Sequence, residues 1–577
     1  MSRKWMAAVG ALIALPTLAA AQRGGGFGGG GATPENSAVF APSAPTFPTA
    51  DPIIRRIWTL GMDSSHTERF SQVLFDSLGP RLMGTPDLKR AQDWLVATYQ
   101  SLGISAKEEQ YGTWRGWIRG PSHIDLIAPR VRTLEGTMVG YSPGTGGKDV
   151  VYEPVILPHF ADSTEFVNWL PQAKGKLVLV NAPPASCRPT DDWAANAAPE
   201  VAAHMDSVRQ ELAREWGGRN VRGTGYSLAL GGGELGVRLE VGGAGGIITS
   251  RPKNGWGTRE IFETYNTKTP AITLSCEDYA LVFRLTENHQ HPKLRLNLDG
   301  KLLGEQPVFN VVATIPGTEH PDEYVVLSSH FDSWDGSSGA TDNGTGTMTM
   351  LEAMRILKLV LPHPSRTIIA GHWSGEEEGE VGSKAFTEDH PDVMKGLQML
   401  FNQDNGTGRI VRLNAGGLPD AAAHLTRWMN TVPVEFKLQT GYDGSPGGPA
   451  GGGSDDFSFS CSGAPITGLG ALSWDYGNYT WHTDRDTYDK IVFPDLHANA
   501  TLTAMLVYLA AQDPTQITRE RIDLVARAHD DSLMAAARGR AAGGGRGFGR
   551  GGGRGRGGPP VWPSCELAPR STKPRLK

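Results

Sequence analysis

The chain has 577 residues, and its 74 Gly and 39 Pro together form about a fifth of it, an excess over ordinary usage. The Gly residues follow no Gly-X-Y period, which excludes a collagen-like fold. The net charge of −6 combines a basic end, with ten Lys/Arg and one acid in 538–577, with an acidic body, which argues against nucleic-acid binding by the core. The length predicts two to four domains.

The first residues have the pattern of a secretory signal, which we place at 1–21. Arg3 and Lys4 precede a short apolar stretch, and Ala19-Ala20-Ala21 forms an A-x-A cleavage site. We therefore expect export to the periplasm or the extracellular space after cleavage near Ala21, followed by a flexible lead-in over 22–50. The apolar stretch is too short to favour an anchor, and no later run predicts a membrane span.

Two helices and a strand are predicted in the segment 51–134. The first helix ends at the Gly79-Pro80-Arg81-Leu82 stretch, and the second runs from about Pro86 to Leu102. The segment 135–295 differs, because short β-like runs alternate with loops around one helix at 199–215. This pattern predicts a separate, mainly β domain inserted into the first, within which Cys187 and Cys276 could form a disulfide.

The segment 296–537 alternates between strands and helices. Strands are expected at 308–314, 323–330, 366–373 and 397–403, and a long helix at 343–359. We therefore predict an α/β fold whose mostly parallel central sheet is flanked by helices and carries the inserted domain. Ligands of such sheets bind at the carboxyl ends of strands.

Candidate ligands follow three of these strands directly. His330 ends one strand and precedes Asp332, Glu376-Glu377-Glu378 follow the next, and Asp404 follows the third. A single strand-end Asp more often caps a helix, and a Glu triplet usually forms a solvated face. Their joint occurrence, together with the absence of CxxC pairs, instead predicts a site for a hard or borderline divalent cation.

The motifs resemble those of the co-catalytic di-zinc exopeptidases. Residues 330–334 (HFDSW) with 339–344 (GATDNG) are similar to the metal-binding segment of this superfamily, which includes bacterial zinc aminopeptidases, glutamate carboxypeptidase and plasma glutamate carboxypeptidase. The spacing from His330 to Asp342 most resembles the last of these. Residues 375–383 resemble the superfamily's Glu-Glu signature, and 79–85 its N-terminal segment. The inserted part resembles a protease-associated domain at 174–180, 244–248 and 270–272.

This resemblance implies a role for each matching residue. His330 and Asp404 would bind one zinc ion, Glu377 and His482 the other, and Asp342 would bridge both. Glu376 would be the general base, and Asp332 would hold His330 in the right tautomer. The Asp342–Asn343 peptide bond would be cis. Two Zn²⁺ ions are the implied cofactors, with Co²⁺ or Mn²⁺ as substitutes that such ligands accept.

One departure from the superfamily concerns the oxyanion donor. Related enzymes often place Tyr just before the final His, whereas this chain has Trp481. The indole N–H of Trp481, the hydroxyl of Tyr479 or no side chain at all could then serve. Asp486, which follows His482 closely, is interpreted as a helix cap.

The sequence thus predicts an exported, zinc-dependent exopeptidase that acts on peptides or dipeptides, as an aminopeptidase or dipeptidase. A carboxypeptidase of the glutamate carboxypeptidase type and a non-catalytic, receptor-like binding protein are the alternatives. The oligomeric state stays open, with a homodimer among the options. The Arg/Gly-rich tail, 538–577, is expected to be disordered, with an RGG-like contact to polyanions as the less favoured reading.

Overall fold

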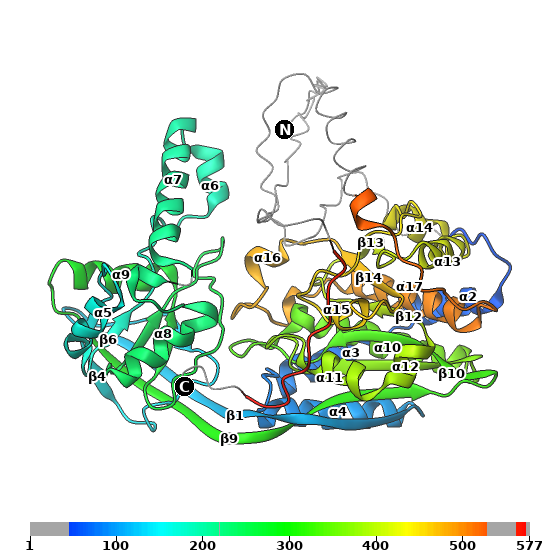
Figure 1. Cartoon of the computed structure of the whole chain (residues 1–577), viewed down its shortest axis with the longest axis horizontal. Coiled ribbons are helices and arrows are strands. Elements are labelled where there is room, and N and C mark those ends of the chain that lie inside the picture. The colour runs from blue at the N-terminus through cyan, green and yellow to red at the C-terminus, as the bar shows by residue number, and fades with distance from the viewer. Residues whose placement is uncertain (1–44, 219, 528–560, 573–577) are drawn as a thin grey trace, which may run out of the picture.

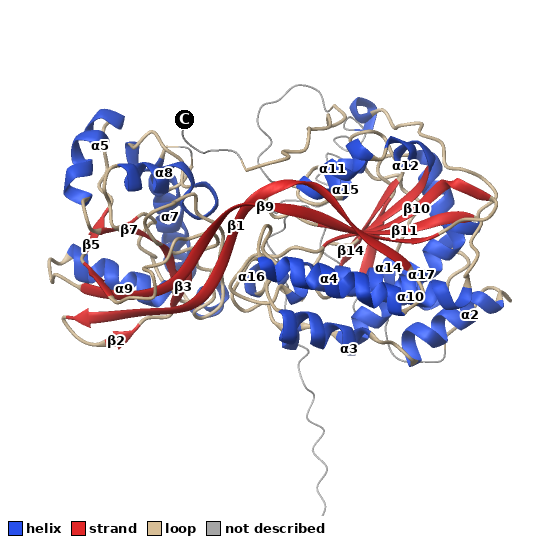
Figure 2. Cartoon of the chain, turned by 90° about the horizontal axis from the view of Figure 1, so that it is seen from below, coloured by secondary structure: helices blue, strands red, loops and turns tan. Residues whose placement is uncertain are grey.

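The computed structural model describes residues 45–218, 220–527 and 561–572 (Figure 1). The predicted signal segment and most of the lead-in and tail lie outside these ranges. Two sheets form the framework of the described part, and one long pair of strands joins them (Figures 1 and 2). No helix of this part is long and apolar enough to cross a membrane.

The larger sheet is mixed, with nine strands in the order β13-β14-β12-β10-β11-β9-β1-β2 and β4 beside β9, where β2 is Arg132–Thr133 and β4 is Val150–Tyr152. Its parallel centre consists of β14 (Ile466–Ala471), β12 (Leu397–Asn402), β10 (His320–His330) and β11 (Arg366–Trp373). The strands β13 (Ile410–Asn414), β9 (Lys293–Ile315) and β1 (Ser105–Ala128) pair antiparallel to their neighbours. The expected mostly parallel sheet is therefore correct only for its centre.

The strands β1 and β9 are much longer than expected and form the ribbon that joins the two sheets (Figure 2). We expected strands only at 122–128 and 308–314. Gly112, Gly116 and Pro121 are residues that typically indicate turns. In the structure these positions coincide with register shifts in the β1–β9 ladder, so the strand bends there and continues.

Helices cover both faces of the large sheet, with α10 and α17 on one side and α11, α12 and α15 on the other (Figure 2). The buried positions of α10 run without a break from Thr345 to Leu357, because this helix packs against the sheet, against α17 beside it, and against α2 and α3. The helices of this part are α2 (Pro52–Trp58), α3 (Thr67–Gln72), α4 (Pro86–Ser101), α10 (Thr345–Val360), α11 (Val381–Asp389), α12 (Pro391–Gly396), α13 (Pro419–Met429), α14 (Val434–Thr440), α15 (Asp456–Ser460), α16 (Tyr476–Tyr479) and α17 (Phe493–Gln512).

The smaller sheet has the order β3-β8-β7-β6-β5, with β5 to β8 parallel and β3 antiparallel. Its strands are β3 (Gly136–Met138), β5 (Pro154–Ile156), β6 (Leu177–Leu179), β7 (Gly246–Thr249) and β8 (Ala271–Leu274), and its main helices are α5 (Ser163–Trp169), α7 (Pro199–Trp216), α8 (Ala229–Val241) and α9 (Cys276–Glu287). The expectation of a mainly β segment is wrong, because parallel strands need such helices to cross over. The helix α8 was not predicted, because its glycines have a low helix propensity. A Cys187–Cys276 disulfide is present.

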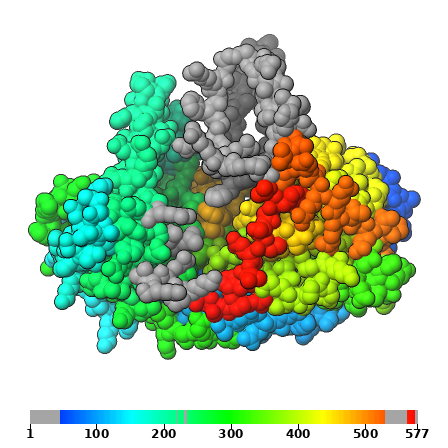
Figure 3. Space-filling view, viewed as in Figure 1, coloured from blue at the N-terminus to red at the C-terminus, as the bar shows by residue number. Residues whose placement is uncertain are grey.

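Two described pieces of the predicted flexible ends make fixed contacts. The Phe47 ring lies 6.1 Å from that of Trp58, and the Val434 amide donates to the carbonyl of Thr46 at 3.0 Å. Residues 561–572 run as a narrow band along one face of the molecule, where Cys565 forms a disulfide with Cys461 (Figure 3). The expected disorder is therefore wrong for 561–572. The prediction rested on the composition of the whole tail, which does not reveal the few side chains that anchor this segment.

Candidate metal centre and active site

The candidate ligands meet at the carboxyl edge of the parallel strands. His330 is the last residue of β10, whose neighbours β11 and β12 end just before Glu377 and Asp404. Asp342 lies in the turn that leads into α10, and His482 follows α16. Because neighbouring parallel strands end at the same edge, five residues from distant parts of the sequence converge there.

Two groups of three side chains result, and they share Asp342. In the first, His330 Nε2 lies 3.5 Å from Asp342 Oδ1 and 3.4 Å from Asp404 Oδ1. In the second, His482 Nε2 lies 3.3 Å from Asp342 Oδ2 and 2.9 Å from Glu377 Oε2. Each oxygen of the Asp342 carboxylate thus faces a different group. The Asp342–Asn343 peptide bond is cis, as the resemblance implies.

The spacing of these atoms fits metal coordination. A tetrahedral zinc site with bonds near 2.0–2.1 Å has ligand atoms about 3.3 Å apart, and the four separations lie around this value. His330 Nε2 and Glu377 Oε1 are buried, and neither has a hydrogen-bond partner in the part of the chain that the structure describes. Unsatisfied nitrogen and oxygen atoms of this kind are what a bound cation would occupy.

The protein alone does not neutralise the charges of this cluster. Burial raises the pKa of Glu376 and of Glu377 well above the ordinary value, and neighbouring carboxylates raise it further. Burial opposes the protonation of His330, but Asp404 and Glu376 outweigh it and raise the pKa of its imidazole. Buried carboxylates at this density need added positive charge to stay ionised at neutral pH, which a divalent cation supplies.

Glu376 belongs to neither group but lies beside the first. Its Oε2 atom is 4.0 Å from His330 Nε2, and its side chain is about nine-tenths buried. The carboxylate of Asp332 accepts hydrogen bonds at 3.3 Å from the amides of both Glu376 and Glu377 and lies 3.6 Å from His330 Nδ1. Asp332 therefore fixes the Glu-Glu turn as well as the histidine, a contact that its position after β10 did not indicate.

Asp486 holds the bridging residue instead of capping a helix. Its carboxylate accepts hydrogen bonds from the amide and the hydroxyl of Thr341, at 2.8 and 2.7 Å, and from the amide of Asp342, at 2.9 Å. The expected cap is therefore wrong, because the short 3-10 helix Tyr488–Lys490 has Thr487 as its N-cap residue and no side-chain cap, whereas the buried amides before α10 need an acceptor. Burial, with the nearby charge of Asp342, raises the pKa of Asp486 to about 7.

Residues 310–507 match the family model described as Peptidase family M28, and this span holds all of the clustered residues above. Over this span the chain is therefore similar to the peptidases of family M28. Carboxypeptidase Q from Xenopus laevis is 25% identical over 421 residues, which cover 71% of this chain and 78% of that protein. Leucine aminopeptidase 1 from Leptosphaeria maculans is 31% identical over 215 residues, covering 34% of this chain and 55% of that protein.

The solved structures extend the similarity to the fold outside the matched span. A peptidase M28 precursor from Shewanella amazonensis SB2B superposes with a TM-score of 0.59 at 23% identity, covering 82% of this chain and 98% of that chain. That coverage exceeds the span 310–507. This chain therefore shares its fold with the Shewanella protein over most of its own length.

Arg81 holds the loop between His330 and Asp342 in place through hydrogen bonds to its backbone. Its fully buried guanidinium donates to the carbonyls of Phe331 at 2.6 Å, Ser338 at 2.6 Å and Gly339 at 2.9 Å. Burial lowers its pKa to about 10, so the side chain stays charged at neutral pH. The sequence indicated this segment only by resemblance, because carbonyl acceptors leave no trace in a residue pattern.

Replacing Arg81 with Met should remove these bonds while keeping much of the apolar stem. We expect the free energy of unfolding to fall by about 3 kcal/mol, because several buried carbonyls lose their donor. Denaturant titration of the metal-free protein measures this loss without any contribution from bound ions. Arg90→Met, at an exposed side chain of α4, is the matched control. An equal effect at both positions would argue against the assigned role.

The aromatic residues near His482 include one that the sequence did not single out. Burial raises the pKa of the Asp342 carboxyl, but His330, His482 and Tyr476 together lower it. The Trp481 ring stacks on His482 with centroids 3.8 Å apart. Tyr479 is 41% exposed. Tyr476 could have been found only by knowing that the 476–481 turn folds back, through the bond from the Trp481 amide to the Tyr476 carbonyl.

The smaller sheet also contributes to the site. Phe262, from the segment between β7 and β8, places its ring 5.1 Å from His482 and 5.4 Å from Trp334, both edge to face. The neighbouring Ile261 amide donates to the His482 carbonyl at 2.7 Å. The second part of the molecule therefore packs directly on a candidate ligand, which nothing in the local sequence around Phe262 predicts.

Proposed function

We propose that this protein is a zinc-dependent exopeptidase that works as an aminopeptidase or dipeptidase. The observation that carries the proposal is the pair of donor groups sharing Asp342, with Glu376 beside them and outside both. His330, Asp342 and Asp404 would hold one Zn²⁺, and Asp342, Glu377 and His482 the other, with Co²⁺ or Mn²⁺ as substitutes. When bound, the two ions would activate a water molecule and polarise the scissile carbonyl.

The chain's own residues then supply proton transfer and orientation. Glu376 takes a proton from the attacking water and delivers it to the leaving amine. Asp332 keeps the Glu376 turn and His330 in register through the contacts described above. Of the three aromatic candidates, we favour Tyr476 as the donor to the developing oxyanion, because it is the one that lowers the pKa of the Asp342 carboxyl.

Blocked dipeptides distinguish the direction of cleavage. We expect the purified protein to hydrolyse a dipeptide with a free amine and an amidated carboxyl end, and to leave its N-acetylated, free-carboxyl counterpart intact. Chromatography of the released residues measures both reactions. The opposite preference would identify a carboxypeptidase, and a zinc-replete protein that cleaves neither of these nor the unblocked dipeptide would identify a binding protein.

We also propose that residues 135–295 form a protease-associated domain and that the chain is exported. The two disulfides support export, because such bonds persist in oxidising compartments. Expression of the full chain followed by cell fractionation and N-terminal sequencing tests this point. A mature protein that starts near residue 22 is expected, and an uncleaved cytoplasmic product would contradict export.

A further inference from the structure

The C-terminal segment 561–572, here called the strap, lies on the large sheet's side of the molecule and makes contacts along its whole length (Figure 3). At its start, Trp562 donates to the Ile522 carbonyl at 3.4 Å, and the guanidinium of Arg521 lies 4.6 Å from its ring centroid. In its middle, Cys565 is bonded to Cys461. A segment with so many anchors has a defined place on the fold, although it follows a low-complexity stretch.

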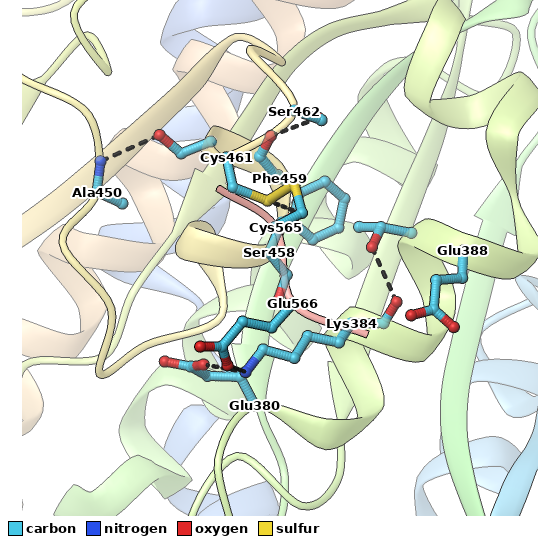
Figure 4. Close-up of a disulfide and its surroundings, with 12 residues drawn as sticks. Glu380, Lys384, Glu388, Ala450, Ser458, Phe459, Cys461, Ser462, Cys565 and Glu566 are labelled. Carbon is cyan, nitrogen blue, oxygen red and sulfur yellow. Dashed lines mark hydrogen bonds and ion pairs between the residues drawn. A yellow bond between two sulfur atoms is a disulfide. The ribbon is translucent and has the colours of Figure 1, made fainter. Parts of the chain in front are cut away.

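The disulfide fixes the end of α15, whose other end faces the active site. Cys461 directly follows this helix and is bonded to Cys565 (Figure 4). The hydroxyls of Ser458 and Ser383 lie 2.9 Å apart, so α15 is also tied to α11. Just before α15, Ser454 accepts a hydrogen bond at 2.8 Å from Asn402, the last residue of β12. The strap thus secures a helix that borders the strand leading to Asp404.

Lys384 connects the strap to the turn that carries the proposed base. Its ammonium lies 3.1 Å from a carboxylate oxygen of Glu566 in the strap, 3.0 Å from Glu380, and donates to the Gly379 carbonyl at 3.1 Å (Figure 4). The Gly379 amide in turn donates to the Glu376 carbonyl at 2.7 Å. Only two hydrogen-bonded steps therefore separate Lys384 from the backbone of Glu376.

The burial of these groups shows which tether matters most. The side chains of Lys384 and Glu380 are 8% and 10% exposed, whereas Glu566 is 71% exposed. An ion pair with one partner in water is weak, so Glu566 alone cannot hold the strap. The covalent bond at the neighbouring Cys565 keeps Glu566 next to Lys384.

The far end of the strap reaches the ribbon between the two sheets. Arg570 pairs with Glu388 and Asp389 of α11, at 2.6 and 2.9 Å, and its carbonyl accepts from the Thr113 amide of β1 at 2.9 Å. Thr572 accepts a hydrogen bond at 2.7 Å from the amide of Arg115, whose guanidinium pairs with Glu263 beyond the ribbon. The strap therefore runs from the large sheet to the strand that leads to the second sheet.

We propose that the disulfide-tethered strap positions the catalytic turn of this peptidase, with Lys384 as the positioning residue that transmits the contact to Gly379 and Glu376. Breaking the tether leaves His330, Asp342, Asp404 and His482 in place but allows the 375–384 segment, which carries Glu376 and the ligand Glu377, to open more often; at saturating zinc the metal content stays unchanged. The consequence for turnover rests on the proposed function, whereas the consequence for local opening does not.

The test compares the two disulfides of the full chain. In C461S/C565S we expect faster amide hydrogen exchange in 375–384 and 450–461, an unchanged metal content, and a kcat at least about tenfold lower, since small misplacements of a catalytic group cost this much. The matched control C187S/C276S removes the other disulfide and should leave exchange in these segments and kcat unchanged.

Two single variants keep the proposal testable if C461S/C565S does not fold. Lys384→Met should reproduce the faster exchange and the loss of kcat with both disulfides intact, and Lys384→Arg, which keeps the charge, should restore most of the turnover. Unchanged exchange and kcat in Lys384→Met, or equal losses in C187S/C276S, would overturn the proposal. A wild-type protein that cleaves no peptide would instead overturn the proposed function, while the exchange measurement would still decide on the strap.

Discussion

Replacing Glu376 with Gln is expected to lower kcat by roughly 10²- to 10⁴-fold while both metal groups keep their ions. The amide retains the shape and the burial of the side chain but cannot take a proton from water. Because Glu376 is in neither ligand group, the metal content should stay at two per chain. Steady-state kinetics on a free-amine dipeptide and elemental analysis of the same preparation measure the two quantities.

The neighbouring Glu378 provides the matched control for this substitution. Its carboxylate belongs to neither ligand group and accepts a hydrogen bond at 2.8 Å from the hydroxyl of Tyr141, which Gln at 378 could still accept. Glu378→Gln should therefore keep most of the turnover. A fully active Glu376→Gln variant, or equal losses at 376 and 378, would show that Glu376 is not the base.

Replacing Asp342 with Ala should abolish binding at both metal groups at once, whereas Asp404→Ala should weaken only the group of His330. The reason is that each oxygen of Asp342 faces a different histidine. Metal analysis of the two variants after dialysis against micromolar zinc is the direct measurement. Loss of a single ion in Asp342→Ala would contradict the bridging role.

Asp342→Ala should change the free energy of unfolding differently with and without zinc. With zinc present the wild-type protein gains about 4 kcal/mol from each site whose ion is at a thousandfold its dissociation constant, and Asp342→Ala loses that gain. Without zinc the variant should differ little from the wild type, because the lost repulsion between Asp342 and Glu377 is offset by the lost attraction of His330 and His482 for Asp342. Thermal unfolding in zinc and in chelator measures both differences.

The positions of His330, Asp342 and Asp404 could be predicted because each adjoins a recognisable element. The strands before His330 and Asp404 contain the apolar runs 324–327 and 399–401, and the helix after Asp342 has apolar residues at helical spacing. Parallel pairing then brings their ends together without further information. His372, inside β11, is a core residue instead of a ligand, because it is buried and its Nε2 atom lies 2.7 Å from the hydroxyl of Tyr99.

The residues that support the site could not be predicted in this way. Arg81, Asp486 and Phe262 act through loops, and their partners lie far away in the sequence. No periodicity encodes which buried carbonyl or amide a loop side chain will meet. The Cys461–Cys565 bond, with 104 residues between its ends, likewise depends on where the tail returns to the fold.

Zinc titration of the metal-free protein tests the central claim most directly, with binding followed by calorimetry and hydrolysis of a free-amine dipeptide followed in parallel. The geometry predicts two equivalents of zinc per chain, and peptide hydrolysis that appears only as they bind. Undiminished hydrolysis by the metal-free protein, or saturation at a single equivalent, would contradict a site built from two groups that share Asp342.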